Sequence, residues 1–563
     1  MNYLENYAFW CNADLSADEK AELDSIKDNV DELKGRFASE LQFGTAGMRG
    51  VMGMGSNRLN YYTVRRAAQG MAAWLVGTDL PKIAAIGYDS RHNSKLFAQV
   101  CAVAFAEAGI VTYLFDRLAP TPMLSFAVRK LNCGCGIVIS ASHNSGEYNG
   151  VKCYGPDGCQ MTDAPAAVVT EQISKIPYFV PEKASFDAYM QQGLICYIGQ
   201  DLWEEYYCTV LREAINPDLI AKTGVQVVYT PLCGTGNEPV REIFKRLGVR
   251  TTVVACQEKP DGDFKTCEYP NPETDAALRE SYAVAQENPC DVILGTDPDC
   301  DRVAIAVPYN GGYKKLSGNE LGCLLLAYIL KARKEKNDIP ENAMAVRSIV
   351  SSALADRIAE TYGVQMRTVL TGFKYIGGEI LALEEQGRED RFVFGFEESC
   401  GYLKGTYARD KDAVVASMLV CEMAADLKQK GKTIVDAMND LYARYGQYLA
   451  KVKSVELSGA DAMEKAAKIM LDLRANTPVS IGGIAVTKVR DYKTRIEIDL
   501  VAGKEASLQL PASNVLEYIL GDFGSVIVRP SGTEPKVKYY FTSIAPTEDE
   551  ARRNLDAMIK QMS

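Results

Sequence analysis

The sequence predicts an α/β protein with three similar α/β domains of mixed or parallel sheets, followed by a smaller C-terminal α+β domain. Short apolar runs alternate with segments of helical periodicity, a pattern typical of sheets that are covered by helices on both faces. From about residue 446 the patterning changes to a period of two, which indicates half-exposed, antiparallel strands. For 563 residues, a prior of about 150 residues per domain gives about four domains.

The composition is that of an ordinary globular protein, with 47% hydrophobic and 24% charged residues. The net charge of −11 argues against non-specific binding to nucleic acid or to an anionic membrane. No apolar run approaches the roughly 18 residues of a membrane span. The 16 cysteines are scattered, which favours a reducing compartment over a disulfide scaffold. The first 19 residues lack Lys and Arg, unlike a signal peptide, so we expect a cytoplasmic protein.

The first predicted domain, residues 1–202, contains the most informative loop of the chain. An apolar run at residues 137–139 stops at a series of small polar residues that includes Ser142. A hydroxyl on such a strand-end loop can carry a group through a covalent step, although many serines in these loops only cap or turn the chain. Nearby, Ser94 is predicted to cap a helix.

The second predicted domain, residues 203–312, contains the acidic triplet Asp297, Asp299 and Asp301 after an apolar run. In extended backbone alternate side chains share a face, so the three carboxylates repel one another unless a cation binds. Oxygen ligands favour Mg²⁺ or a similar hard ion. The alternative is a solvated acidic turn. The adjacent Arg302 offers a guanidinium to a phosphate.

The third predicted domain, residues 313–445, contains polar loops at residues 371–374, 396–399 and 409–412. Paired acids and a hydroxyl at a strand end are suited to hydrogen bonding with sugar hydroxyls, and a solvated loop is the alternative for each.

The fourth predicted domain, residues 446–563, contains a loop that begins at Arg529 and continues with Ser531, Gly532 and Thr533. Glycine lets backbone N–H groups point at an anion, so this loop is a candidate phosphate cradle. An ordinary Pro-Ser-Gly turn is the alternative.

Histidine is scarce, with only His92 and His143 in the chain. A zinc site built from several histidines is therefore nearly excluded. His143 directly follows Ser142, an awkward position for a base acting on its neighbour, so proton transfer falls more naturally to Lys, Glu or Asp.

Together these loops resemble those of the α-D-phosphohexomutase superfamily, which includes phosphoglucomutase and phosphomannomutase, and they occur in the family order from residue 43 to residue 538. The resemblance implies four domains around a central cleft. It makes Ser142 the phosphorylated residue, and Asp297, Asp299 and Asp301 the ligands of one Mg²⁺ per chain, with the serine phosphate completing the site.

The resemblance also implies roles for the remaining polar residues. Glu397 and Ser399 would contact the 3- and 4-hydroxyls of the sugar. The substrate would further be bound by Thr371, Gly372, Lys374, Arg409, Arg529, Ser531, Gly532 and Thr533. The phosphate on the serine would be neutralised by Arg49, Lys152 and Arg302. Lys411 is the candidate for proton transfer, because residues 409–412 resemble the segment that bears the family's proposed base. To act as a base, Lys411 needs burial and neighbouring cations to depress its pKa, and His143 competes with it.

The implied reaction moves phosphate between O1 and O6 of a hexose through a phosphoserine enzyme and a bisphosphorylated sugar, which also serves as activator. The sugar loop lacks the His common in dual-specificity relatives and the serine loop continues Asn-Ser-Gly, so glucose is favoured over mannose or a pentose. The different-class alternatives are a haloacid-dehalogenase-type phosphatase, with Asp297 as nucleophile, and a non-catalytic sugar-phosphate binder. The expected partner is a small sugar phosphate, and the expected state is a monomer or small homo-oligomer.

Overall fold

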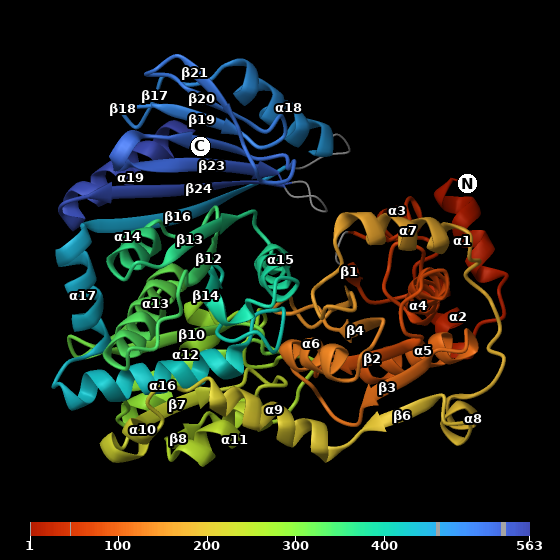
Figure 1. Ribbon diagram of the computed structural model, residues 1–563. Helices are drawn as coiled ribbons and strands as arrows, with labels where there is room; N and C mark the ends of the chain where they lie inside the picture. The colour runs from red at the N-terminus through yellow and green to blue at the C-terminus, as the bar shows by residue number, and fades with distance from the viewer. Residues whose placement is uncertain (1, 45–46, 458–461, 531–535, 563) are drawn as a thin grey trace.

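The structure, a computed structural model, describes residues 2–44, 47–457, 462–530 and 536–562. Four large sheets with their helices follow one another along the chain (Figure 1). The first three are mixed sheets, and the fourth is antiparallel. The predicted fold class is therefore confirmed.

The first sheet has the strand order β1-β5-β4-β2-β3-β6, in which β1 and β5 pair antiparallel with their neighbours and the other pairs are parallel. Asn60 caps helix α4 (Tyr61–Val76), in which residues 63–68 and 70–72 are buried. The elements of this unit are α1 (Tyr3–Cys11), α2 (Ala17–Ser25), α3 (Val30–Phe37), β1 (Gly47–Val51), α4 (Tyr61–Val76), β2 (Ile83–Tyr88), α5 (Ser94–Glu107), β3 (Val111–Phe115), α6 (Thr121–Lys130), β4 (Cys135–Ile139), β5 (Tyr148–Tyr154), α7 (Asp163–Ser174), α8 (Phe186–Gln191) and β6 (Ile195–Ile198).

The prediction that Ser94 caps a helix is wrong. Asn93 occupies the N-cap position of α5 with a left-handed φ of 61° and makes no side-chain cap bond, and Ser94 is the first helical residue. The Ser94 hydroxyl instead donates to the buried carboxylate of Asp89 at 2.7 Å. A buried acceptor outside the helix has therefore taken the hydroxyl that the sequence pattern assigns to capping.

The second sheet has the order β11-β10-β9-β7-β8 and extends past the predicted domain boundary at residue 312, because β11 pairs with β10. Its elements are α9 (Gln200–Arg212), α10 (Asp218–Thr223), β7 (Gln226–Thr230), α11 (Asn237–Leu247), β8 (Arg250–Val253), α12 (Asp275–Glu287), β9 (Val292–Thr296), β10 (Val303–Tyr309) and β11 (Gly312–Lys315).

The third sheet has the order β13-β12-β14-β15. Ser317 and Glu320 form a capping box at the start of its first helix. Its elements are α13 (Gly318–Glu335), β12 (Met344–Ser348), α14 (Leu354–Thr361), β13 (Gln365–Val369), α15 (Phe373–Glu384), β14 (Phe392–Glu397), β15 (Gly401–Leu403), α16 (Ala413–Gln429) and α17 (Ile434–Tyr445).

The fourth sheet has the order β16-β24-β23-β22-β19-β20-β21, and its pairs are antiparallel, as the period-two pattern predicts. It lies above the third unit in Figure 1. Its elements are β16 (Gln447–Glu456), α18 (Ala462–Ala475), β17 (Ser480–Ile481), β18 (Ile484–Ala485), β19 (Lys488–Asp491), β20 (Ile496–Asp499), β21 (Lys504–Ser507), β22 (Leu516–Ile519), β23 (Gly524–Pro530), β24 (Lys536–Ala545) and α19 (Glu548–Met562).

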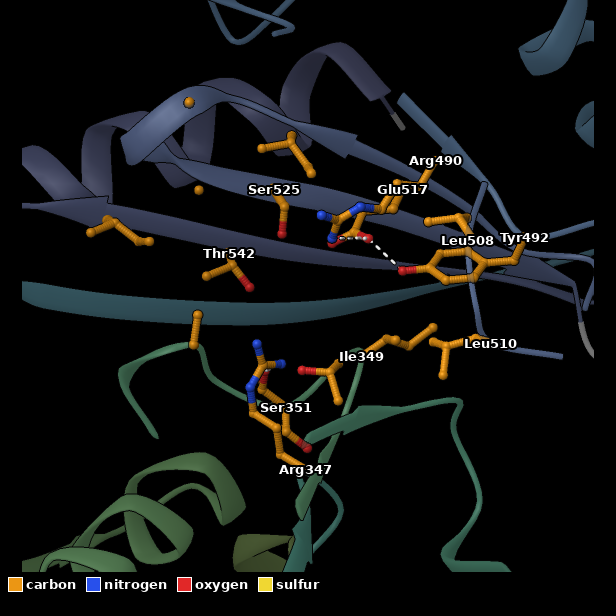
Figure 2. A pocket seen from close by; sticks show the side chains of 16 residues that line it. Arg347, Ile349, Ser351, Arg490, Tyr492, Leu508, Leu510, Glu517, Ser525 and Thr542 are labelled. Carbon is orange, nitrogen blue, oxygen red and sulfur yellow. Dashed lines mark hydrogen bonds and ion pairs between the residues drawn. The ribbon is translucent and has the colours of Figure 1, made fainter. Parts of the chain in front are cut away.

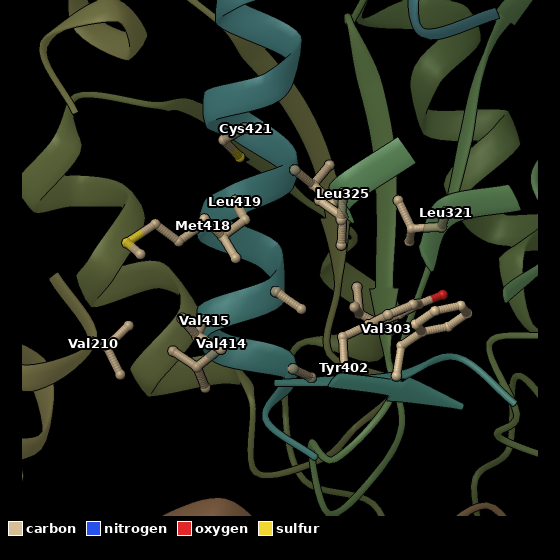
Figure 3. Packing of buried hydrophobic residues seen from close by; sticks show 14 of the residues in the cluster. Val210, Val303, Leu321, Leu325, Tyr402, Val414, Val415, Met418, Leu419 and Cys421 are labelled. Atoms are coloured by element: carbon tan, nitrogen blue, oxygen red, sulfur yellow. The ribbon is translucent and has the colours of Figure 1, made fainter. Parts of the chain in front are cut away.

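One helix, α16, fastens the second and third units together. Its residues from 413 to 425 are all buried, and all but Ser417 and Glu422 are apolar, as expected of a helix at the centre of a core. Figure 3 shows Met418 on the side of α16 that faces Val210, while Leu325 and Val303 lie on the other side of the helix. The two sheets therefore share a core, which keeps the loops at their edges in a fixed relation.

The third and fourth units enclose a cavity of about 350 Å³. Figure 2 shows Arg347 of β12 and Arg490 of β19 on opposite sides of it, together with Glu517 and Tyr492. Glu517 accepts hydrogen bonds from Tyr492 (2.7 Å) and Arg490 (3.3 Å). Asp356 binds the other arginine, Arg347, through two nitrogens at 2.7 Å. Both arginines of the cavity are therefore paired with acids.

None of the helices in the described ranges combines the length and the apolar character needed to cross a membrane.

Candidate active site

The same strand arrangement carries a polar loop in each of the first three sheets. A parallel strand (β4, β9 or β14) is followed directly by an antiparallel neighbour (β5, β10 or β15). The connections of these hairpins are the serine loop, the acidic triplet and the sugar loop that the sequence singled out. Three equivalent hairpin turns thus supply the candidate site.

Ser142 lies in the first of these turns and is 2% exposed. Its Oγ donates a hydrogen bond to Oδ2 of Asp297 at 2.9 Å and lies 3.1 Å from Nδ1 of His143. The backbone of Ser142 is left-handed, with φ 53°, a conformation that costs of order 1–3 kcal/mol in a non-glycine residue. The structure therefore brings the predicted nucleophile and the predicted metal ligands together, and holds the serine in a strained conformation.

The acidic triplet forms one compact group. Asp297, Asp299 and Asp301 are buried, and each offers a carboxylate oxygen within 4.8 Å of the others. Asp297 Oδ1 accepts hydrogen bonds from the backbone N–H of Asp301 (3.0 Å) and of Arg302 (2.9 Å). Thr121 donates its hydroxyl to Asp299 Oδ2 at 2.7 Å. The turn is thus fixed from its own backbone and from the first unit.

Two carboxylate oxygens of the triplet indicate whether the site suits a metal ion. Asp299 Oδ1 and Asp301 Oδ1 are buried, and no group in the described part of the chain donates a hydrogen bond to either. Buried carboxylate oxygens without a partner are costly. An oxygen-only donor set with open lone pairs matches the ligand preference of Mg²⁺, so the residues present fit such an ion.

Two lysines lie against the triplet. Lys152 of β5 donates to Asp299 Oδ2 and lies 3.5 Å from Asp301 Oδ2, and Lys411 Nζ lies 3.1 Å from Asp301 Oδ2. Burial raises the pKa values of Asp299 and Asp301, but these ammonium groups outweigh it and the pKa of each is lowered. For Asp297, burial and the two neighbouring carboxylates raise the pKa well above its usual value. The triplet is thus only partly neutralised by the chain's own cations.

Two arginines complete the cationic surroundings. Arg302 is ion-paired with Glu273 at 3.2 Å. Arg49 of β1 donates to Oδ1 of Asn144 in the serine loop at 3.1 Å. Burial, Arg302 and Arg49 lower the pKa of His143 well below its usual value, so both arginines act on the electrostatics of this loop.

The expected depression of the Lys411 pKa is wrong for this structure. Burial lowers the pKa, but the carboxylates of Asp301, Asp410 and Glu397 raise it above its ordinary value. Asp410 Oδ1 accepts from Lys411 Nζ at 2.9 Å. The sequence pattern showed the cations of the site but not how many acids would face this one ammonium group.

The two predicted sugar loops meet at one hydrogen bond. Glu397, the last residue of β14, is buried, and its Oε1 accepts from the backbone N–H of Gly372 at 2.7 Å. Gly372 has φ 120°, a backbone conformation that favours glycine. Ser399 lies in the turn after β14, and Thr371 Oγ1 is buried without a hydrogen-bond partner among the described residues. Polar groups of both loops are thus gathered beside Glu397.

Lys374 and Arg409 take other partners. Lys374 Nζ donates to Asp163 at 2.9 Å, and the buried Arg409 donates to Glu384 at 2.7 Å. The sequence motif could not anticipate these acids, because Asp163 lies 211 residues away from Lys374. In this structure the two cations fasten segments together, and their role as sugar contacts stays a prediction.

Only part of the predicted phosphate-binding loop lies within the described residues. Arg529 lies on β23 opposite Lys538 of β24, whereas Ser531, Gly532 and Thr533 lie outside the described residues. Burial, Lys536 and Arg529 lower the pKa of Lys538, which indicates clustered positive charge at this edge. Lys538 was not selected from the sequence, although its alternation with Lys536 places both on one face of a strand.

Thr121 is another residue that sequence reasoning missed. It lies at the start of α6, 178 residues from the carboxylate it contacts, and belongs to no polar motif. Only the folded structure shows the connection.

The chain matches known proteins in sequence along most of its length. The phosphoglucomutase/phosphomannomutase family is matched by its sequence models for α/β/α domain I (residues 40–178), domain II (residues 205–311), domain III (residues 317–445) and the C-terminal domain (residues 486–561). A phosphoglucomutase of Staphylococcus epidermidis is 36% identical over 89% of this chain and 90% of its own length. One of Staphylococcus aureus is 36% identical over 94% of both chains.

Solved structures have the same fold. A phosphoglucomutase/phosphomannomutase family protein from Burkholderia thailandensis superposes with a TM-score of 0.65 at 16% identity, over 93% of this chain and 97% of its own. Parafusin, a phosphoglucomutase from Paramecium in an open form, gives 0.65 at 17% identity, over 93% and 94%.

A polar loop on each of three equivalent sheets, with a fourth unit closing the set, is the architecture of a sugar-phosphate mutase. The chain belongs to the phosphoglucomutase/phosphomannomutase family, within the α-D-phosphohexomutase superfamily. It is a phosphohexomutase, an isomerase that acts as an intramolecular phosphotransferase.

Proposed function

We propose that this protein is a phosphoglucomutase that interconverts glucose 1-phosphate and glucose 6-phosphate through a phosphoserine at Ser142. The observation that carries the proposal is the 2.9 Å hydrogen bond from Ser142 Oγ to Asp297 within a triplet of buried carboxylates. The 36% identity to proteins named phosphoglucomutase supports glucose as the sugar.

Asp297, Asp299 and Asp301 would hold one Mg²⁺, with the phosphoryl group on Ser142 as a further ligand. When bound, the ion supplies positive charge that polarises and neutralises the phosphoryl oxygens. The open lone pairs on Asp299 and Asp301 support this assignment.

The chain's own residues do the positioning that phosphoryl transfer requires. Lys152, Arg302 and Arg49 would neutralise the transferring group from different sides. Glu397 and Ser399 would hold the sugar hydroxyls in either orientation, so that O1 or O6 faces Ser142. Arg529 and its loop, with Ser531, Gly532 and Thr533, would hold the phosphate at the far end of the sugar.

Ser142 gives its phosphoryl group to the free sugar hydroxyl, which forms a sugar bisphosphate. The bisphosphate turns over in the cleft and returns its other phosphoryl group to Ser142. Lys411, whose Nζ lies 3.1 Å from Asp301 Oδ2, is the candidate for moving the hydroxyl proton, and this role requires that a cation at the triplet offset the carboxylates that raise its pKa. His143, whose Nδ1 faces Ser142 Oγ, is the competing candidate.

Intact-protein mass spectrometry tests the phosphoserine. The enzyme incubated with glucose 1,6-bisphosphate is expected to gain one phosphate, which is lost with excess unphosphorylated sugar and is absent in Ser142→Ala. A Ser142→Ala variant that retains mutase turnover would reject the proposal.

A parallel assay with glucose 1-phosphate, mannose 1-phosphate and ribose 1-phosphate tests the sugar. We expect the highest kcat/KM for glucose 1-phosphate. A strong preference for mannose or ribose would assign a phosphomannomutase or a phosphopentomutase instead. A cytoplasmic location and a monomeric or small homo-oligomeric state remain predictions.

A further inference from the structure

One buried guanidinium lies beneath the serine loop. Arg91 follows β2, and its Nη2 donates to the carbonyl oxygens of Ser142 (2.6 Å) and Asn144 (2.5 Å). Its Nη1 donates to those of Ser145 (2.7 Å) and Tyr148 (3.0 Å). Four backbone carbonyls of a single hairpin turn therefore converge on one planar side chain.

Arg91 is itself held on its other sides. Asp89 Oδ2 lies 3.3 Å from Nε, and Asp89 Oδ1 accepts from the backbone N–H of Arg91 at 3.0 Å. The ring of Phe264, from the second unit, lies 5.0 Å from the guanidinium carbon, within the range of a cation–π contact. The guanidinium group of Arg91 is thus held by an acid, an aromatic ring and four carbonyls, and has little freedom to move.

This contact fixes the least favourable backbone position of the loop. Ser142 has φ 53°, and its peptide groups are pinned on both sides. Its N–H donates to Ser140 Oγ at 2.8 Å, while its carbonyl binds Arg91. In a trans peptide the C=O and the following N–H point in opposite directions. The N–H groups of His143 and Ser145 are therefore turned away from Arg91.

We infer that Arg91 is a positioning residue, which directs Ser142 Oγ at Asp297 and thereby sets the rate of phosphoryl transfer. The inference rests on the proposed function. Arg91 reaches Ser142 through the loop, because its two Nη groups donate to backbone carbonyls of that loop. A lysine would keep the charge but could not span four acceptors with a rigid fork.

The test compares Arg91→Lys with a matched control, Arg65→Lys. Arg65 is also a buried arginine of the first unit, and binds Glu107 through Nη2 at 3.0 and 2.9 Å without touching the serine loop. For Arg91→Lys we expect kcat about 100-fold lower, as for a displaced reacting group, with KM for glucose 1-phosphate changed less than about threefold. The ³¹P resonance of the phosphoserine, formed with glucose 1,6-bisphosphate, is expected to shift or broaden. Arg65→Lys is expected to lower only the Tm.

The inference is overturned if folded Arg91→Lys keeps kcat within about threefold of the parent and an unchanged ³¹P signal. If Arg91→Lys does not fold, Asp89→Asn serves instead, since it keeps Arg91 but weakens its hold. A kcat for that variant about tenfold below that of Arg65→Lys supports the inference, and an equal kcat rejects it. If neither variant folds, Arg91 is a stability residue and the inference is rejected.

Ser142→Ala run in parallel separates the two claims. If Ser142→Ala still turns over, the proposed function fails. If Ser142→Ala is inactive while Arg91→Lys is fully active, only the role of Arg91 fails.

Discussion

Replacing Thr121 by valine removes a single hydrogen bond to the acidic triplet and little else. The hydroxyl donates to Asp299 Oδ2 at 2.7 Å, while the backbone N–H of Thr121 donates separately to the carbonyl of Asp299 at 2.9 Å. Valine has nearly the same shape and keeps the backbone bond. The substitution therefore isolates one contact between the first and the second unit.

The expected size of the effect follows from the burial of this carboxylate. A hydrogen bond to a charged group contributes about 1.5–3 kcal/mol. The free energy of unfolding of the metal-free variant should therefore be lower than that of the parent by this amount. Loss of a residue that orients a metal ligand weakens metal binding by about 10–100-fold. We therefore expect the Mg²⁺ dissociation constant to rise by that factor.

Isothermal titration with Mg²⁺ and denaturant unfolding in chelator measure the two effects separately. Thr112→Val is the control, because Thr112 is buried in the same unit and, among the described residues, its hydroxyl donates only to a local carbonyl, that of Ile110 at 3.3 Å. The reasoning is refuted if Thr121→Val binds Mg²⁺ as tightly as the parent, or if Thr112→Val weakens binding equally.

Three further predictions concern the metal, the sugar loops and the core. Removing divalent ions with a chelator should abolish mutase turnover, and Mg²⁺ should restore it; full activity in chelator would contradict the metal assignment. Gly372→Ala should raise KM, because φ 120° is strained for alanine and the N–H that binds Glu397 would move; an unchanged KM in steady-state kinetics would count against this contact. Burial raises the pKa of Glu422 above 4.5, so the folded state holds a proton on this carboxyl at pH values where the unfolded state has lost it. The contribution of Glu422 to stability is therefore lost as the pH rises through the raised pKa. The Tm of Glu422→Gln relative to the parent should therefore rise as the pH is raised from below 4.5, and a pH-independent difference would disprove the shift.

Local pattern was enough to predict the fold class and the position of each polar loop. Ser142 and Asp297 both follow short apolar runs, and such runs are buried strands with loops at their ends. The antiparallel character of the last sheet followed from period-two alternation at residues 495–500. These features depend on residues that are close together in the chain, so they can be predicted from the sequence pattern alone.

Partners distant in sequence could not be predicted in the same way. Arg409 belongs to a polar segment, but Glu384 determines where its guanidinium points. Asp410 and Asp301 reverse the expected pKa shift of Lys411. Ser94 carries a capping residue type, yet Asp89 takes its hydroxyl. In each case an acid outside the predicted motif, namely Glu384, Asp301 or Asp89, takes part in the contact, and motif patterns alone do not report such partners.

The charges around the triplet indicate why phosphate and metal belong together in the proposed mechanism. Lys152, Lys411 and Arg302 lie against the three carboxylates, but Lys411 is also paired with Asp410 and Arg302 with Glu273, so acids outnumber these cations. A phosphoryl group on Ser142 would add about two negative charges at neutral pH, and a divalent ion adds two positive ones. A phosphoryl group alone would add to the surplus of negative charge in a buried site, which costs several kcal/mol per ion. A divalent ion bound beside it offsets that charge, which is the physical reason for the two to be bound together.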